Sequence, residues 1–241
     1  MTAPIYAIGD IHGQIGFLEQ ALDWIEADGG TDADIVFLGD LVDRGPNSRA
    51  VVELVSSAQA AGRNWTVVTG NHDRMFTRFL DDGALHDAQI KSGLDWFDRR
   101  LGGLGTLASY GVTDAGSRPF AEVLEEARAK VPEAHRAFLK GLPYYEERDE
   151  LLFVHAGIRP GVPLAEQVED DLIWIRADFL DDARPHPWLV VHGHTAIDIP
   201  CHHGNRVNLD GGAGYGRPLY PAVFEGPKAW MLDEGGRMSL G

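Results

Sequence analysis

The stretch IYAIGDIHG, residues 5–13, decides how this chain folds, because a short apolar run ends in glycine and passes directly into polar residues. The same order recurs in IVFLGD at 35–40 and in WTVVTGN at 65–71. Apolar spacings of three and four residues predict a helix after each of the first two runs, over 15–25 and about 48–61. Apolar strands that alternate with helices predict a parallel sheet covered on both faces.

The polar residues that end these three strands predict where a site lies. Asp10, Asp40 and Asn71 are separated by 30 and 31 residues, which is the length of a βαβ unit. In a parallel sheet of this kind, ligands bind at the carboxyl ends of the strands. We therefore expect all three side chains on the same rim of the sheet.

The pattern changes between residues 73 and 150. Helices are predicted, with glycine-rich turns such as 101–105 between them, at about 74–81, 85–100, 120–130 and 133–140. We interpret about 84–143 as a mostly helical insertion beside the rim, within a single domain that spans 1–241. Five apolar runs then predict further strands: Leu151–Val154, Trp188–Val191, Arg206–Leu209, Leu219–Phe224 and Ala229–Leu232. Because the closing strands are short and closely spaced, we expect an antiparallel or mixed second sheet.

Composition narrows the function classes. The chain has 241 residues and a formal net charge of −16, with 37 acidic against 21 basic residues. This charge argues against nucleic acid or an anionic membrane surface as the main partner. The single cysteine, Cys201, cannot form an internal disulfide. The first residues do not have the pattern of a secretory signal, and no apolar run has the length of a membrane span, so we expect a cytoplasmic protein.

Six oxygen and imidazole donors follow predicted strand ends: Asp10, His12, Asp40, Asn71, His155 and His194. Taken singly, an aspartate after a strand is commonly a helix N-cap, and a lone histidine is more often a hydrogen-bonded residue than a ligand. Six such donors at five strand ends favour a metal site instead. The donor types suit Mn, Fe or Zn, and their number fits two ions that share a carboxylate.

Five ordered motifs carry a resemblance to a known family. They are Gly9–Gly13 (GDIHG), Gly39–Pro46 (GDLVDRGP), Gly70–Asp73 (GNHD), His155–Gly157 (HAG) and Gly193–Thr195 (GHT). Over about residues 5–210 the chain is similar to bacterial serine/threonine phosphoprotein phosphatases, which belong to the calcineurin-like metallophosphoesterases. The resemblance implies an α/β sandwich with two central mixed β-sheets flanked by helices, to which the helical insertion is added.

The resemblance also implies a role for each donor. Two divalent ions would be held by Asp10 and His12 on the first, Asp40 as the bridge, and Asn71, His155 and His194 on the second. Manganese is the expected metal, with iron or zinc as alternatives. His192 lies two residues before His194 and is the alternative ligand, but the Gly-His-Thr pattern selects His194 and leaves His192 in a supporting position.

Four more residues match positions that the family uses for catalysis and for substrate. His72 resembles the general acid, and Asp43 resembles the carboxylate that orients it and favours the protonated imidazole. Arg44 would grip a phosphate oxygen, because guanidinium matches phosphate geometry. Arg176, in the sequence WIR, resembles a second phosphate-binding arginine, with a solvated arginine in a loop as the alternative.

These roles imply hydrolysis of phosphate monoesters on protein serine or threonine by attack of a metal-bridging hydroxide, with a phosphoprotein or phosphopeptide as the partner. The alternative is a symmetrical diadenosine tetraphosphate hydrolase or a small-molecule phosphatase of the same fold. That hydrolase family typically has alanine in place of Asp43, so Asp43 favours the monoesterase. A non-catalytic binding module or a metal-dependent scaffold is disfavoured, because every donor and His72 are present.

The stretch DGGAGYG, residues 210–216, follows a predicted strand but precedes no helix, so it does not match a nucleotide-binding fingerprint. Bacterial relatives often have DTGA here, and Gly211 departs from that pattern. What this loop contributes to substrate choice is therefore left open. Tyr215 could stack over the substrate, but we expect a packed or simply exposed tyrosine instead.

Overall fold

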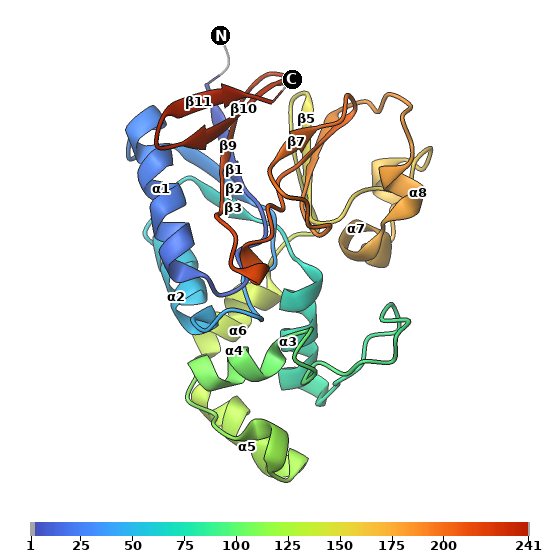
Figure 1. Ribbon diagram of the computed structural model, residues 1–241. Coiled ribbons are helices and arrows are strands. Elements are labelled where there is room, and N and C mark those ends of the chain that lie inside the picture. The colour runs from blue at the N-terminus through green and yellow to red at the C-terminus, as the bar shows by residue number, and fades with distance from the viewer. Residues whose placement is uncertain (1–2, 241) are drawn as a thin grey trace.

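Two β-sheets pack face to face in the computed structural model, which describes residues 3–240 (Figure 1). The first sheet has the order β11-β10-β9-β1-β2-β3, with β1 (Ile5–Ile8), β2 (Asp34–Phe37), β3 (Trp65–Val67), β9 (Ala222–Glu225), β10 (Lys228–Asp233) and β11 (Gly236–Ser239). The second has the order β4-β5-β6-β8-β7, with β4 (Tyr145–Arg148), β5 (Leu151–Val154), β6 (Leu189–His192), β7 (Cys201–His202) and β8 (Arg206–Asn208). Both sheets combine parallel and antiparallel pairs. The predicted α/β sandwich of two mixed sheets is confirmed.

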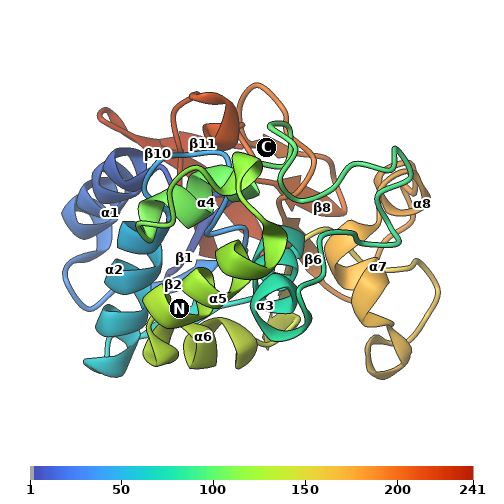
Figure 2. The same cartoon turned by 90° about the horizontal axis from the view of Figure 1, so that it is seen from below.

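Helices cover the outer faces of the sheets and one end of the molecule. They are α1 (Ile15–Gly29), α2 (Ser48–Ala60), α3 (Asn71–Asp82), α4 (Gly103–Ser109), α5 (Phe120–Lys130), α6 (Glu133–Lys140), α7 (Glu169–Trp174) and α8 (Ala177–Leu180). Figure 1 shows α1 and α2 beside the first sheet and α7 and α8 beside the second. Helices α3 to α6 lie beyond the ends of the strands, where Figure 2 shows them from below.

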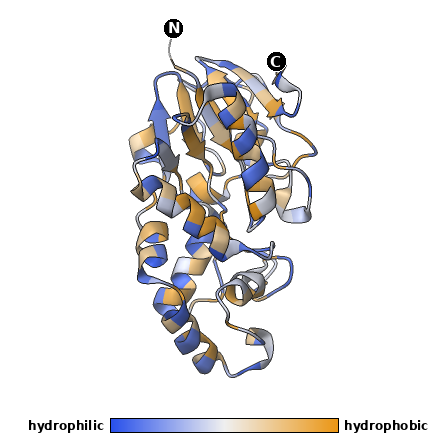
Figure 3. Ribbon diagram, turned by 90° about the vertical axis from the view of Figure 1, so that its left-hand side faces the viewer, coloured by the Kyte–Doolittle hydropathy of each residue, from blue (hydrophilic) through white to orange (hydrophobic). Residues whose placement is uncertain are grey.

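Alternate side chains of the buried strands serve two different cores, because strand residues point to opposite faces in turn. Ala7 and Val36 point between the sheets and pack with Phe153 and Val207 of the second sheet. Phe37, the neighbour of Val36, packs in the core on the helical side. Figure 3 shows the resulting distribution, with apolar strands inside and helices that carry both apolar and polar residues. This packing lies on both sides of the first sheet, whose parallel strands β1, β2 and β3 end at one rim.

One predicted helix of the insertion is wrong. Helices α5 and α6 have the predicted bounds, but 85–100 forms turns and loop, and α4 forms where 101–105 was expected to be a turn. The side chain of Asp95 accepts hydrogen bonds from the backbone N–H groups of Phe97 and Asp98, at 3.0 and 3.1 Å. Such side-chain bonds close local turns and compete with helical hydrogen bonds, which apolar spacing alone does not reveal.

The closing strands also differ from the prediction, because β9 and β10 belong to the first sheet instead of the second. Strand β9 runs antiparallel to β1, with Val223 opposite Tyr6. This register directs Ala222 and Phe224 into the core between the sheets, where both are buried. One edge of β1 is free to pair with a further strand, and local sequence does not encode which strand pairs with it.

The insertion shares a core with the first sheet. Trp96, Leu107 and Val123 of the insertion belong to the same buried cluster as Phe37 and Val67 of the sheet. This continuity supports the single-domain organisation, which we keep as a proposal. Within residues 3–240, no helix is both long and apolar enough to cross a bilayer.

Candidate functional site

The six predicted donors meet at one rim, where the carboxyl ends of strands from both sheets come together. Asp10, Asp40 and Asn71 follow β1, β2 and β3, whereas His155 and His194 follow β5 and β6. The backbone N–H of His194 donates to Oδ1 of Asp10 at 3.0 Å, which ties the second sheet to the first. All six side chains are buried, none more than 8% exposed. The structure therefore assembles the predicted set from segments that lie far apart in the chain.

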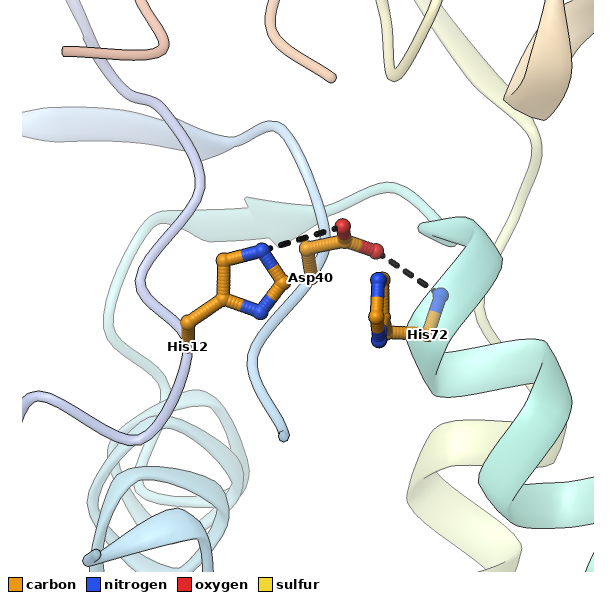
Figure 4. A group of neighbouring side chains, drawn as sticks. All are labelled: His12, Asp40 and His72. Atoms are coloured by element: carbon orange, nitrogen blue, oxygen red, sulfur yellow. Dashed lines mark hydrogen bonds and ion pairs between the residues drawn. The ribbon is translucent and has the colours of Figure 1, made fainter. Parts of the chain in front are cut away.

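Asp40 lies at the centre of the first group of donors (Figure 4). Its Oδ2 is 3.4 Å from Nε2 of His12, and the same nitrogen is 3.9 Å from Oδ2 of Asp10. Nδ1 of His12 donates to the carbonyl oxygen of Val42 at 2.8 Å, so the neutral ring turns the lone pair of Nε2 toward the carboxylates. A carbonyl partner of this kind is what orients histidines that bind metals.

Asn71 is the centre of the second group. Its Oδ1 is 2.9 Å from Nε2 of His155 and 2.9 Å from Nδ1 of His194. Because Nδ1 of His155 donates to the carbonyl oxygen of Leu38 at 2.8 Å, its Nε2 and the Asn71 oxygen are two acceptors that face each other. Nε2 of His155 is also 3.5 Å from Oδ1 of Asp40. Acceptors arranged in this way without a proton between them fit a shared cation.

The pKa shifts of the rim residues also indicate a cation site. Burial, then the charges of Asp210 and Asp40, raise the pKa of Asp10 well above its usual range. Burial and the charge of Asp73 do the same to the pKa of Asp40. Burial also lowers the pKa of His155 to about 3, which leaves a neutral imidazole able to coordinate. Crowded carboxylates repel one another, and a cation among them removes this cost.

Two sets of three residues could each hold a metal ion, because within each set the ligand atoms lie within 4.8 Å of one another. One set is His12, Asp40 and His72, and the other is Asp10, Asp40 and His155. Both contain Asp40, which directs Oδ2 toward His12 and Oδ1 toward His155. The second ring nitrogen of His194, Nε2, is buried and has no hydrogen-bond partner among residues 3–240. The residues present therefore fit divalent ions, with Asp40 placed to touch both groups.

Backbone strain is concentrated at this rim. The left-handed region, where φ is positive, is adopted at His12 (50°), Asp40 (51°), Asp43 (73°), Arg44 (63°) and His194 (65°). Within residues 3–240, the other non-glycine residues with positive φ are Asp114 and Asp149. This conformation costs free energy for residues with a side chain, and it persists where the surrounding structure enforces it, commonly at functional sites.

His72 and Asp43 form a hydrogen-bonded pair beside the first donor group. Nδ1 of His72 is 2.7 Å from Oδ2 of Asp43. The same carboxylate accepts hydrogen bonds from Nε1 of Trp96 at 2.7 Å and from Oγ1 of Thr106 at 2.7 Å. Sequence reasoning predicted the pair but missed the two donors from the insertion, because they lie 53 and 63 residues further along the chain with no motif to mark them.

In the protein without substrate, burial opposes the protonated imidazole that we expected for this pair. Burial, followed by the guanidinium of Arg44, lowers the pKa of His72 well below its usual range. Burial also raises the pKa of Asp43 to about 7. The effect of the Asp43 partner on the imidazole is thus opposed by burial and by Arg44, which both favour the neutral form. A bound phosphate anion would oppose the effect of Arg44 and raise the pKa of His72 again.

Both predicted phosphate-binding arginines lie at the rim. Arg44 donates to Nε2 of His12 at 2.6 Å and to Nε2 of His72 at 3.1 Å, so a cationic group already lies against these lone pairs. Arg176 is exposed and donates to Oγ1 of Thr195 at 2.9 Å, which holds it beside the Gly-His-Thr motif. The alternative of a freely solvated Arg176 is less consistent with this bond.

His192 points away from the donors. Its Nε2 accepts a hydrogen bond from Arg206 at 3.3 Å, and its ring packs edge-on against Phe179 at 5.2 Å between centroids. The structure thus brings His194 to Asn71 and His192 to Arg206 and Phe179 instead.

Two buried aspartates at the rim were not among the predicted site residues. Asp73 accepts hydrogen bonds from the backbone N–H groups of Leu41 at 3.0 Å and Gly70 at 3.1 Å, which holds two rim loops together. Asp210 lies close enough to Asp10 for its charge to raise the pKa of that residue. Their position inside the GNHD and DGGAGYG stretches was the available signal.

Known proteins are similar to this chain in sequence and in fold. The model of the calcineurin-like phosphoesterase family matches residues 3–219. The chain is similar to the asymmetrical bis(5'-nucleosyl)-tetraphosphatase PrpE of Halalkalibacterium halodurans, with 27% identity over an alignment of 240 residues. The alignment covers 90% of this chain and 88% of the relative. It is also similar to the symmetrical bis(5'-nucleosyl)-tetraphosphatase of Bordetella parapertussis, with 42% identity over 73 residues, 30% of this chain and 25% of the relative. The crystal structure of a candidate diadenosine tetraphosphatase has a TM-score of 0.64 and 23% identity, covers 98% of this chain and 96% of that one, and shares the fold.

Proposed function

We propose that this chain, which belongs to the calcineurin-like phosphoesterase family, hydrolyses dinucleoside tetraphosphates at the rim of its two sheets. The observation that carries the proposal is the position of Asp40 among the donors, with Oδ2 at 3.4 Å from Nε2 of His12 and Oδ1 at 3.5 Å from Nε2 of His155, because two ions that share a carboxylate in this way would clamp a phosphoryl group. The names of the relatives support the substrate class, and they favour it over the phosphoprotein that the motifs implied.

The relatives also bear on where the substrate is cut. The relative that is similar along 90% of the chain is named asymmetrical, whereas the symmetrical one is similar over 30%. We therefore expect diadenosine tetraphosphate and water to give ATP and AMP. Asp43 is correspondingly weaker support for a monoesterase, since the relative that is similar along 90% of the chain is named a tetraphosphatase.

Two divalent ions at the donor groups would neutralise phosphate charge and lower the pKa of an attacking water. The arginines then act directly on the substrate. Arg44, whose guanidinium now donates to His12 and His72, is placed to turn its N–H groups to phosphate oxygens, and Arg176 can bind from the side of the second sheet. Planar guanidinium groups bind phosphate oxygens in pairs, which fixes the phosphoryl group in position.

His72 is placed to hold a proton for the leaving group. Asp43, fixed by Trp96 and Thr106, orients Nδ1 and leaves Nε2 facing the arginine. Hydrolysis forms a bond between phosphorus and the water oxygen and breaks one anhydride P–O bond, and the leaving oxygen departs as a phosphate anion or takes the proton. A nucleotide phosphate is a good leaving group, so this reaction depends only moderately on the acid.

The same pair supports a second candidate function, hydrolysis of phosphoserine or phosphothreonine. A serine alkoxide is strongly basic and leaves only with a proton, so an imidazole held at 2.7 Å by a buried carboxylate suits this reaction well. The site alone accommodates either chemistry.

A side-by-side assay tests the proposal. We would measure kcat/KM for diadenosine tetraphosphate and for phosphoserine, phosphothreonine and phosphotyrosine peptides, separate the nucleotide products by chromatography, and quantify bound metals. We expect the tetraphosphate to be the best substrate, ATP and AMP as products, and two ions per chain. Two ADP would support the symmetrical alternative, and preference for a phosphopeptide would overturn the tetraphosphatase assignment.

A further inference from the structure

An exposed aromatic ring lies at the edge of the donor groups. Tyr215 is 63% exposed, although it ends the short 3-10 helix Ala213–Tyr215 in a loop that is otherwise largely buried. Among the exposed large hydrophobic side chains of residues 3–240, this one directly contacts a predicted site residue. The guanidinium carbon of Arg44 lies 5.1 Å from the centre of its ring. The ring is therefore one side chain away from the place where a phosphate would bind.

The loop that carries Tyr215 is held against the site by close backbone packing. A Cβ atom at Gly214 would lie 2.6 Å from Cδ2 of His12 and 2.9 Å from Cδ of Arg44, so no side chain fits there. Gly212 adopts a φ of 84° and leaves the space that the guanidinium of Arg217 fills. These glycines explain why the DGGAGYG stretch needs its unusual composition: the backbone must touch the site residues directly.

A second cation lies beside the ring and is fixed in place. Arg217 donates to the carbonyl oxygen of Ile197 at 3.0 Å and to Asp198 at 2.8 Å. Its guanidinium carbon is 5.9 Å from the centre of the Tyr215 ring. The side chain of Arg217 is 36% exposed, so it remains available to an anionic ligand. The Tyr215 ring therefore lies next to two arginines, Arg44 of the site and Arg217.

We propose that Tyr215 stacks one nucleobase of the substrate while Arg44 and Arg217 bind the phosphates that connect this base to the reacting centre. This inference rests on the proposed function and names the residues that select a nucleotide. Bases stack on aromatic side chains largely without regard to their identity, and arginine contributes to both stacking and phosphate binding. A phosphoserine or phosphothreonine side chain has no ring that could stack on this one. Tyr215 is exposed, as expected from the sequence, and the proposal takes up the alternative that it stacks over the substrate.

The test compares variants of Tyr215 on two substrates. We would measure kcat/KM for diadenosine tetraphosphate and for inorganic tripolyphosphate, which has the anhydride but no base, in the wild type, Tyr215→Ala and Tyr215→Phe. Tyr215→Ala should lower the kcat/KM for diadenosine tetraphosphate, divided by that for tripolyphosphate, by roughly 5- to 100-fold, which is the effect of one lost stacking partner. Tyr215→Phe keeps the ring and should retain most of the ratio. Phe120→Ala, at another exposed aromatic residue far out on α5, serves as the control and should leave the ratio unchanged.

The outcomes separate this inference from the proposed function. If the wild type cleaves diadenosine tetraphosphate and Tyr215→Ala has the same ratio, the nucleobase site is wrong and the proposed function stands. If the wild type cleaves only phosphopeptides, the proposed function is wrong, and calorimetry on the same proteins decides the site. Weaker binding of diadenosine tetraphosphate to Tyr215→Ala than to the wild type would support the nucleobase site. No binding to the wild type, or equal binding to both proteins, would overturn it.

Discussion

The rim of the sheets and the helical insertion bury different kinds of residue. The rim buries aspartates and histidines on left-handed backbone, and burial raises the pKa of its carboxylates. The insertion instead contributes apolar residues such as Trp96 and Leu107 to the main core. The difference indicates that the rim bears a cost in stability for its chemistry, while the insertion supplies stability. The two regions meet at one carboxylate, Asp43, which accepts hydrogen bonds from Trp96 and Thr106.

The largest effect on activity is expected at Asp40, the carboxylate of the rim that faces both donor groups. Asp40→Asn should abolish activity and weaken the binding of at least one ion, because this side chain faces both donor groups. Removing a crowded buried charge should also leave the metal-free protein as stable as the wild type or raise Tm by about 2–4 °C, the shift that about 1 kcal/mol produces in a chain of this size. Metal analysis and thermal unfolding measure both. A single ion at full activity in the wild type would refute the two-ion site.

The next largest effect is expected for the acid, and its size should depend on the leaving group. His72→Asn should slow phosphoserine peptide hydrolysis by roughly 10²–10⁴-fold, the range of acid–base catalysis, and should slow p-nitrophenyl phosphate and diadenosine tetraphosphate far less. Asp43→Asn should show the same selectivity with a smaller loss. Equal slowing of all substrates at full metal content would identify His72 as a phosphate- or metal-binding residue instead.

The arginines test whether the rim binds phosphate as well as metal. Arg44→Ala should lower kcat/KM by roughly 10- to 1000-fold, the scale of one lost charge-stabilising donor. We expect Arg176→Ala to act in the same direction. Arg100→Ala, at an exposed arginine of the insertion, is the matched control and should behave as the wild type. Near-normal kinetics of Arg44→Ala would remove it from the site.

The smallest effect on activity is expected where the two regions meet. Trp96→Phe keeps most of the packing but removes the N–H donor to Asp43, so it should destabilise the fold by about 1–3 kcal/mol. It should lower the activity toward phosphoserine peptides about tenfold, the low end for a residue that supports a site residue. Trp188→Phe is the control, because that indole donates to an exposed glutamate, Glu147, away from the rim. Unchanged kinetics with lost stability would confine Trp96 to a packing role.

Local sequence predicted much of the rim. A strand that ends in glycine and then aspartate places that aspartate at the rim wherever the strand lies in the sheet, so Asp10 and Asp40 could be assigned without a structure. Local sequence failed at 85–100, where apolar spacing predicted a helix but Asp95 closes turns with its side chain. It also could not predict the pKa of His72, because burial and the nearness of Arg44 arise only in the folded chain.

The sequence by itself indicated the strand ends that carry the candidate donors, because a strand that passes into glycine and then a polar residue is a pattern of a few neighbouring residues, and the resemblance of its motifs implied the two-sheet architecture. Only the tertiary structure decided that β9 pairs with β1, that His194 rather than His192 meets Asn71, and that Trp96 donates to Asp43. It also decided that the Tyr215 ring lies beside Arg44. These contacts join residues that are distant in the chain, and each depends on the packing of whole sheets and loops, which no local pattern records.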